Sequence, residues 1–205
     1  LHTAYHPEGS APFKKNNANV TVLSDKAYRH CHVNSKTYDE SSIGCKLGGS
    51  SPNVAVWGDS HAISIYGELS QVSHGGVEGY SFSGCPLIFM SEVIGNQHCS
   101  KWQASVLRKL ERSDHIQYVL LTFRHSYYLY GSQFEPSPPK KSFQNIPSTH
   151  SEEFYWRNFE EAVRRLADSG KRVILLHPTP EIYLSPSRLA EPYSIFNDPK
   201  NHNEI

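Results

Sequence analysis

Several familiar signals are missing from this chain of 205 residues. No apolar run approaches the roughly 20 residues that a membrane-spanning helix needs. Neither the GxGxxG motif of dinucleotide-binding proteins nor the GxxxxGK[ST] motif of P-loop proteins is present. The formal net charge is +0, whereas nucleic-acid-binding proteins usually carry a basic stripe. We therefore expect no cofactor and no nucleic-acid partner.

The four cysteines do not form a CxxC pair, so zinc-knuckle spacing is absent and we expect no metal site. They fall into two local pairs, Cys31 with Cys45 and Cys85 with Cys99, each of which would close a loop of about 15 residues. Two loop-closing disulfides are typical of an oxidising compartment such as a periplasm or the cell exterior. The alternative is four reduced, buried cysteines in a cytosolic protein.

The pattern of apolar residues predicts one α/β domain with a lead-in. Residues 1–20 are polar and indicate a linker or an extended arm, and residues 21–52 indicate a lead-in that is stapled by a disulfide rather than packed. Residues 53–205 are expected to form the domain itself. Strands are predicted at 54–57, 77–82, 116–123 and 172–177, and helices at 62–72, at 98–112 and between Thr149 and Gly170. This alternation predicts a parallel sheet with helices on both faces.

Residues 124–150 interrupt the alternation. They are rich in Tyr, Pro and Ser, and they predict a long irregular loop that is either functional or disordered. Three tyrosines near its start form either a sugar-stacking wall or part of the packing of the core or of a lid: Tyr127, Tyr128 and Tyr130.

Polar and conformationally special residues follow each predicted strand. In chain order they are Gly58-Asp59-Ser60-His61, Ser83-Gly84-Cys85-Pro86, Arg124-His125 and His177-Pro178. Because ligands of open parallel sheets bind beyond the carboxyl ends of the strands, these residues predict a site at one edge of the sheet.

Ser60 is the candidate nucleophile at this edge. A tight strand-to-helix bend, which Gly58 permits, would lift the Ser60 hydroxyl out of the sheet. The Ser60 N–H and the helix dipole would face a developing oxyanion, and Gly84 could offer a second N–H. Asp59 is expected to cap or brace the turn, and His61 is too close in sequence to serve as the base of Ser60. The alternative for this stretch is an ordinary N-cap serine.

The remaining polar candidates have plainer alternatives. Arg124 either reaches the site or forms a surface salt bridge, and His177 is expected to be structural rather than catalytic. His30 and His32, which flank Cys31, are expected to be a solvated pair beside a disulfide rather than metal ligands.

The stretch VAVWGDSHA (54–62) resembles block I of the SGNH (GDSL-like) hydrolase superfamily. More narrowly, residues 31 to 182 resemble the SGNH domains fused to acyltransferase-3 membrane proteins. The features that carry this resemblance are the Cys31/Cys45 pair, WGDSHA, SGCPLI, EEFYWRNFEEAVRRL and HPTPEI. The resemblance implies a three-layer, flavodoxin-like α/β sandwich, a Ser60 nucleophile, and an oxyanion hole from the backbone of Ser60 and Gly84.

The activity that the resemblance implies is O-acyl transfer, usually of acetyl, through a serine acyl-enzyme. The acceptor would be a cell-surface carbohydrate such as lipopolysaccharide O-antigen or another envelope glycan. An acyltransferase-3 domain would deliver the acetyl group, and the domain would be periplasmic or extracellular, tethered to the inner membrane in the full-length protein and monomeric as a fragment. A secreted carbohydrate acetylesterase and a non-catalytic glycan- or partner-binding domain remain alternatives.

Two departures from the family pattern affect the expected site. The third strand ends in LLTFRHS without the usual Gly-x-Asn-Asp, so Arg124 becomes a candidate oxyanion ligand. The C-terminal Asp-x-x-His that supplies the acid and the base is absent, which leaves His177, Asp198 and His202 as weak candidates. We therefore expect either a fragment of a longer protein or a domain without the usual dyad.

Overall fold

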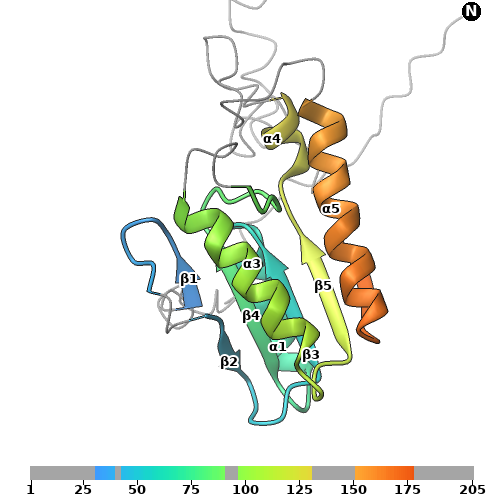
Figure 1. Ribbon diagram of the computed structural model, residues 1–205. Coiled ribbons are helices and arrows are strands. Elements are labelled where there is room, and N and C mark those ends of the chain that lie inside the picture. The colour runs from blue at the N-terminus through green and yellow to red at the C-terminus, as the bar shows by residue number, and fades with distance from the viewer. Residues whose placement is uncertain (1–30, 40–42, 91–96, 131–150, 178–205) are drawn as a thin grey trace, which may run out of the picture.

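The computed structural model describes residues 31–39, 43–90, 97–130 and 151–177 (Figure 1). The strands are β1 (His32–Val33), β2 (Cys45–Leu47), β3 (Val54–Gly58), β4 (Val77–Phe82), β5 (Tyr118–Thr122) and β6 (Arg172–Leu175). The helices are α1 (Ala62–Val72), α3 (Gln97–Glu111), α4 (His125–Tyr130) and α5 (Ser151–Asp168). No helix within these ranges is long and apolar enough to cross a bilayer.

The strands form one sheet in the order β1-β4-β3-β5-β6, and β2 pairs with β4 outside this path. All pairings along the path are parallel, and β2 runs antiparallel to β4. Gly58 lies opposite Ser81 of β4 and opposite Thr122 of β5. The carboxyl ends of the three central strands therefore meet at one edge of the sheet.

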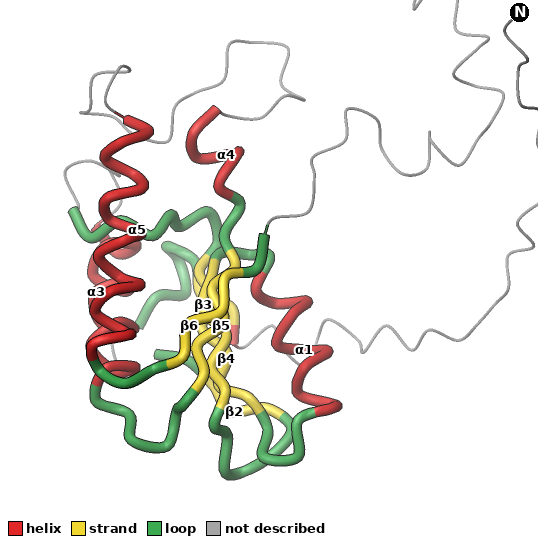
Figure 2. The backbone as a smooth tube through the Cα atoms, turned by 90° about the vertical axis from the view of Figure 1, so that its right-hand side faces the viewer, coloured by secondary structure: helices red, strands yellow, loops and turns green. Residues whose placement is uncertain are grey.

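Helices cover both faces of the sheet, which confirms the predicted three-layer α/β sandwich. Figure 2 shows α1 on one face and both α3 and α5 on the other. Because successive side chains of a strand point to opposite faces, Val56 packs in the cluster with Ala62 and Tyr66 of α1, whereas Trp57 packs in the cluster with Trp102 of α3. A strand that is buried on both sides is a continuous apolar run, as VAVW is.

Both predicted disulfides are present, Cys31–Cys45 and Cys85–Cys99. The first joins the residue before β1 to the start of β2 at the side of the sheet. The second joins the turn after β4 to the first turn of α3.

The lead-in differs from the prediction, because its described part is packed as well as stapled. Both β1 and β2 pair with β4, and Val33 and Leu47 are buried. Strands of two and three residues carry too little period-two pattern to be recognised in a sequence. Residues 1–20 lie outside the described ranges.

The segment 124–150 also differs, because its first part forms the short helix α4. Figure 1 shows α4 beside the beginning of α5, at the end of the sheet where β5 finishes. Residues 131–150 lie outside the described ranges, so a lid role for them is not tested.

Candidate active site

The bend between β3 and α1 depends on the close approach of β5. A β-carbon added to Gly58 would lie 1.9 Å from the carbonyl oxygen of Thr122 and 3.1 Å from the β-carbon of Ala62. Glycine is therefore required here for space between two paired strands. The turn after it places Ser60 in an exposed position directly before His61, the N-cap of α1.

Asp59 is almost completely buried, with an exposed fraction of 1%, and its carboxylate accepts three hydrogen bonds. Oδ1 accepts from the backbone N–H of His61 at 2.9 Å. Oδ2 accepts from the backbone N–H of Arg124 at 2.7 Å and from the hydroxyl of Tyr128 at 2.9 Å. A buried carboxylate needs such donors to offset its lost hydration. Asp59 thus braces the serine turn against the residues that follow β5.

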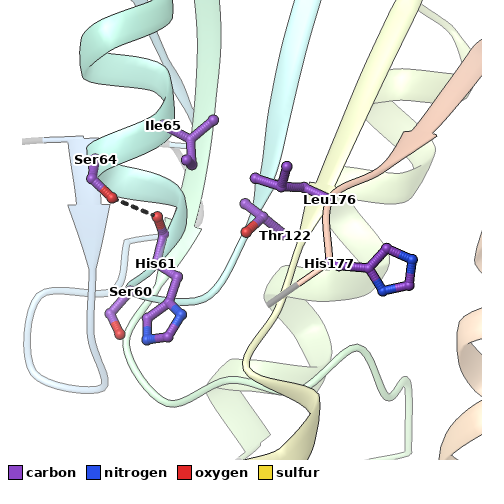
Figure 3. A pocket seen from close by; sticks show the side chains of 7 residues that line it. All are labelled: Ser60, His61, Ser64, Ile65, Thr122, Leu176 and His177. Carbon is purple, nitrogen blue, oxygen red and sulfur yellow. Dashed lines mark hydrogen bonds between the residues drawn. The ribbon is translucent and has the colours of Figure 1, made fainter. Parts of the chain in front are cut away.

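Ser60 lies at the edge of a pocket of about 290 Å³ between α1 and the end of β6. The pocket is lined by Ser60, His61, Ser64, Ile65, Thr122, Leu176 and His177. Figure 3 shows Ser60 and His61 on one side of it and His177 on the other. The hydrogen bond drawn there joins the Ser64 hydroxyl to the carbonyl oxygen of His61 at 3.1 Å. The described residues therefore place His177 at the same pocket as Ser60 but give Ser60 no hydrogen-bonded histidine.

Leu176, the residue after β6, is an apolar lining residue of this pocket and is exposed by 36%. Two of the weak acid and base candidates, Asp198 and His202, lie outside the described residues.

Gly84 follows β4 at the same edge as Ser60. Its φ of +60° lies in the left-handed region that favours glycine, and no atom lies within 4 Å of the place that a β-carbon would take. A side chain at this position would therefore meet open space. The Gly84 N–H as an oxyanion donor remains a prediction.

Gln103 of α3 fixes the loop after Gly84, and the sequence analysis did not single it out. Its side-chain amide donates to the carbonyl oxygen of Pro86 at 2.8 Å and accepts from the indole N–H of Trp57 at 2.7 Å. Its side chain is completely buried. The available signal was a glutamine beside Trp102 on the apolar face of a predicted helix.

Arg124 contacts Asp59 through its backbone and Tyr127 through its side chain. Its backbone N–H is donated to Oδ2 of Asp59 and is therefore not directed at an oxyanion. Its guanidinium lies over the ring of Tyr127, with Cζ 4.6 Å from the ring centroid. This is a cation–π contact.

Tyr128, Tyr155 and His125 form a cluster of polar aromatic side chains next to Asp59. The hydroxyl of Tyr155 and Nδ1 of His125 are 2.6 Å apart, and the Tyr128 ring stacks on that of Tyr155 at 6.3 Å. Burial and the negative charge of Asp59 both raise the pKa of Tyr155. Burial lowers the pKa of His125, and the charge of Asp59 partly offsets this effect. Of the three tyrosines considered above, Tyr128 thus belongs to the packing.

His32 is not the solvated residue that the sequence predicts. Its Nδ1 lies 2.9 Å from the hydroxyl of Ser81, which in turn lies 3.0 Å from the hydroxyl of Tyr66. The parallel pairing of β1 with β4 brings His32 opposite Ser81. Burial lowers the pKa of His32, although the charge of Asp59 opposes the shift. His30 lies outside the described residues, and the described part of the chain holds no group of three or more His, Cys, Asp or Glu placed to bind a metal.

Comparisons with known proteins place the chain in a family. The family model described as SGNH domain (fused to AT3 domains) matches residues 30–204. Among solved structures, the chain is similar to the periplasmic domain of the lipopolysaccharide acetyltransferase of Salmonella ser. Paratyphi A, with 13% identity and a TM-score of 0.46. That match covers 80% of this chain but 60% of the other one. A search of curated proteins finds no significant match. Since the family model matches most of the length of this chain, the chain belongs to the family of SGNH domains that are fused to AT3 domains.

Proposed function

We propose that this domain is a serine-dependent O-acetyltransferase that modifies a cell-surface carbohydrate, such as lipopolysaccharide O-antigen or another envelope glycan. The observation that carries the proposal is the difference in exposure between two adjacent residues. Ser60 is exposed at a pocket, whereas Asp59 before it is buried and bound by three donors. A serine nucleophile needs an accessible hydroxyl and a base that takes its proton, and the fixed bend supplies the first of these.

The reaction proceeds in two steps through an acetyl ester of Ser60. The Ser60 oxygen forms a bond to the acetyl carbonyl carbon, its proton passes to a base, and the donor departs with its own oxygen or sulfur. A sugar hydroxyl then attacks the ester, takes the acetyl group and returns the Ser60 hydroxyl. The N–H groups of Ser60 and Gly84 and the guanidinium of Arg124 are the proposed oxyanion ligands.

The first step needs a base that takes the proton of Ser60. General-base catalysis contributes roughly 10²–10⁴-fold to such reactions. His177 is the first candidate because it lines the same pocket as Ser60. Asp198 and His202 follow as a second test.

An AT3 membrane domain is the proposed source of the acetyl group. The family is described by its fusion to such domains, and we place this domain on the far side of the membrane from the cytoplasm. The two disulfides are consistent with an oxidising compartment.

The test is the intact mass of the protein after incubation with p-nitrophenyl acetate. We expect one acetyl adduct or ester turnover in the wild type, and neither in Ser60→Ala. Ser64→Ala is the matched control because Ser64 lines the same pocket one helical turn further on. Equal acetylation of the wild type and Ser60→Ala would contradict the proposal.

Water as the acceptor would make the same domain a carbohydrate acetylesterase. The exposure of Ser60 favours this second candidate, since nothing among the described residues shields an ester there from water. Incubation with an acetyl donor and a glycan separates the two, because the transferase yields acetylated glycan and the esterase yields free acetate.

A further inference from the structure

The serine turn and α4 meet at a buried hydrogen bond. The hydroxyl of Tyr128 donates to Oδ2 of Asp59 at 2.9 Å, and the two residues are 69 positions apart in the sequence. The exposed fractions are 2% for Tyr128 and 1% for Asp59. Because both groups are buried, water cannot replace the bond without rearrangement.

The same carboxylate fixes the backbone on both sides of the proposed nucleophile. Asp59 precedes Ser60, and its Oδ1 accepts from the N–H of His61, which follows Ser60. Its Oδ2 also accepts from the N–H of Arg124. Rotation of the carboxylate would therefore disturb the Ser60 N–H, the Ser60 hydroxyl and the Arg124 backbone together.

Tyr128 is itself held in place by its surroundings. Its ring packs in one buried cluster with Ile88 and Tyr155, and Tyr155 is joined to His125 by a hydrogen bond. Burial, together with the negative charge of Asp59, raises the pKa of Tyr128 well above 10. The hydroxyl thus remains a donor over the whole pH range of an assay.

We propose that Tyr128 is a positioning residue for Ser60, and that it acts through the carboxylate of Asp59. Its hydroxyl holds the carboxylate in the rotamer that fixes the serine turn and the loop after β5. This inference rests on the proposed function of Ser60.

The test variant is Tyr128→Phe, which removes the hydroxyl and keeps the buried ring. The matched control is Tyr80→Phe, because the hydroxyl of Tyr80 also donates to a buried carboxylate, that of Glu78. Glu78 lies four residues before Phe82 along β4, which at 3.3 Å per residue is about 13 Å from the edge of the sheet that carries Ser60. Both variants lose one buried bond to a carboxylate, but only one of these carboxylates touches the serine turn.

The first readout is the rate constant for acylation of Ser60 by p-nitrophenyl acetate, measured where both variants are folded. We expect Tyr128→Phe to lower it about tenfold, equivalent to about 1.4 kcal/mol, and Tyr80→Phe to change it less than about twofold. Acylation of Tyr128→Phe at the wild-type rate would overturn the inference. Equal losses in the two variants would also overturn it, since they would show a general effect of destabilisation.

The second readout is hydrogen exchange of the backbone N–H groups of His61 and Arg124, which does not depend on chemistry at Ser60. We expect exchange at both to be about tenfold faster in Tyr128→Phe than in Tyr80→Phe, once corrected for global stability. Unchanged protection of both would refute the positioning role. A wild type without Ser60-dependent acylation would refute the proposed function alone, and hydrogen exchange would still decide whether Tyr128 positions the turn.

Discussion

The two disulfides close loops of equal length, so chain entropy predicts equal losses of stability when either is removed. In each, the paired cysteines are 14 positions apart. A loop of this size corresponds to about 3 kcal/mol at 25 °C. The variants to compare are Cys31→Ala/Cys45→Ala and Cys85→Ala/Cys99→Ala.

The two disulfides also differ in burial, and this difference adds to the loss of stability that chain entropy predicts. Both Cys85 and Cys99 are completely buried, whereas Cys45 is partly exposed. Two alanines in the buried site leave a cavity that costs about 1 kcal/mol more. We therefore expect a loss of about 3 kcal/mol for the first variant and about 4 kcal/mol for the second.

The same comparison tests the role of the loop that carries Gly84. Cys85 follows Gly84 directly and ties it to α3, whereas the other disulfide lies at β1 and β2. The loss of the second disulfide is therefore expected to slow acylation of Ser60 more than the loss of the first.

Urea unfolding of both variants gives the free energies, and acylation by p-nitrophenyl acetate gives the rates. A loss below about 1 kcal/mol in either variant would refute the entropy argument. Equal rates of acylation in the two variants would refute the link between Cys85–Cys99 and the site.

Two further perturbations test the serine turn and the cluster behind it. Gly58→Ala places a β-carbon 1.9 Å from the Thr122 carbonyl oxygen, so we expect a loss of about 3 kcal/mol in urea unfolding. Gly170→Ala meets no atom within 4 Å but has a φ of +84°, which strains alanine, so we expect a loss of about 1 kcal/mol. Burial lowers the pKa of His125 below its ordinary 6.5, so the unfolded chain binds the proton more readily and the unfolding free energy falls as the pH drops below 6.5. His125→Gln is expected to reduce this dependence of the unfolding free energy on pH. Urea midpoints of both proteins below pH 6.5 measure it, and an equal dependence in the two would contradict the argument.

The layers of the fold could be predicted because their strands and helices are long enough to show a pattern of apolar residues. The strand VAVW is buried on both faces and reads as a continuous apolar run, and the helix that ends before Gly170 repeats its apolar residues every 3.6 positions. The strands β1 and β2 were missed because pairing with β4, and not their own pattern, makes them strands. The helix α4 was missed because its residues Tyr127 and Tyr128 are held by tertiary packing.

The position of the serine turn could be predicted from the sequence, but the long-range hydrogen bonds that hold it could not. The local sequence shows that Gly58, Asp59 and Ser60 follow a strand and precede a helix. Nothing local shows that Tyr128 bonds to Asp59 or that Gln103 joins Trp57 to Pro86, because these contacts span 69, 46 and 17 residues. Such pairs depend on strand order, which one sequence does not specify.

The bonds of Asp59 also bear on the order in which the protein folds. Its partners Arg124 and Tyr128 come 65 and 69 residues later in the chain, after β4, α3 and β5. Closing such long loops costs entropy that a single turn does not offset, so we expect β5 to pair with β3 before the carboxylate is fully bound. We expect a partly folded chain to carry Ser60 on a loose turn, so that reactivity of this serine reports that folding is complete.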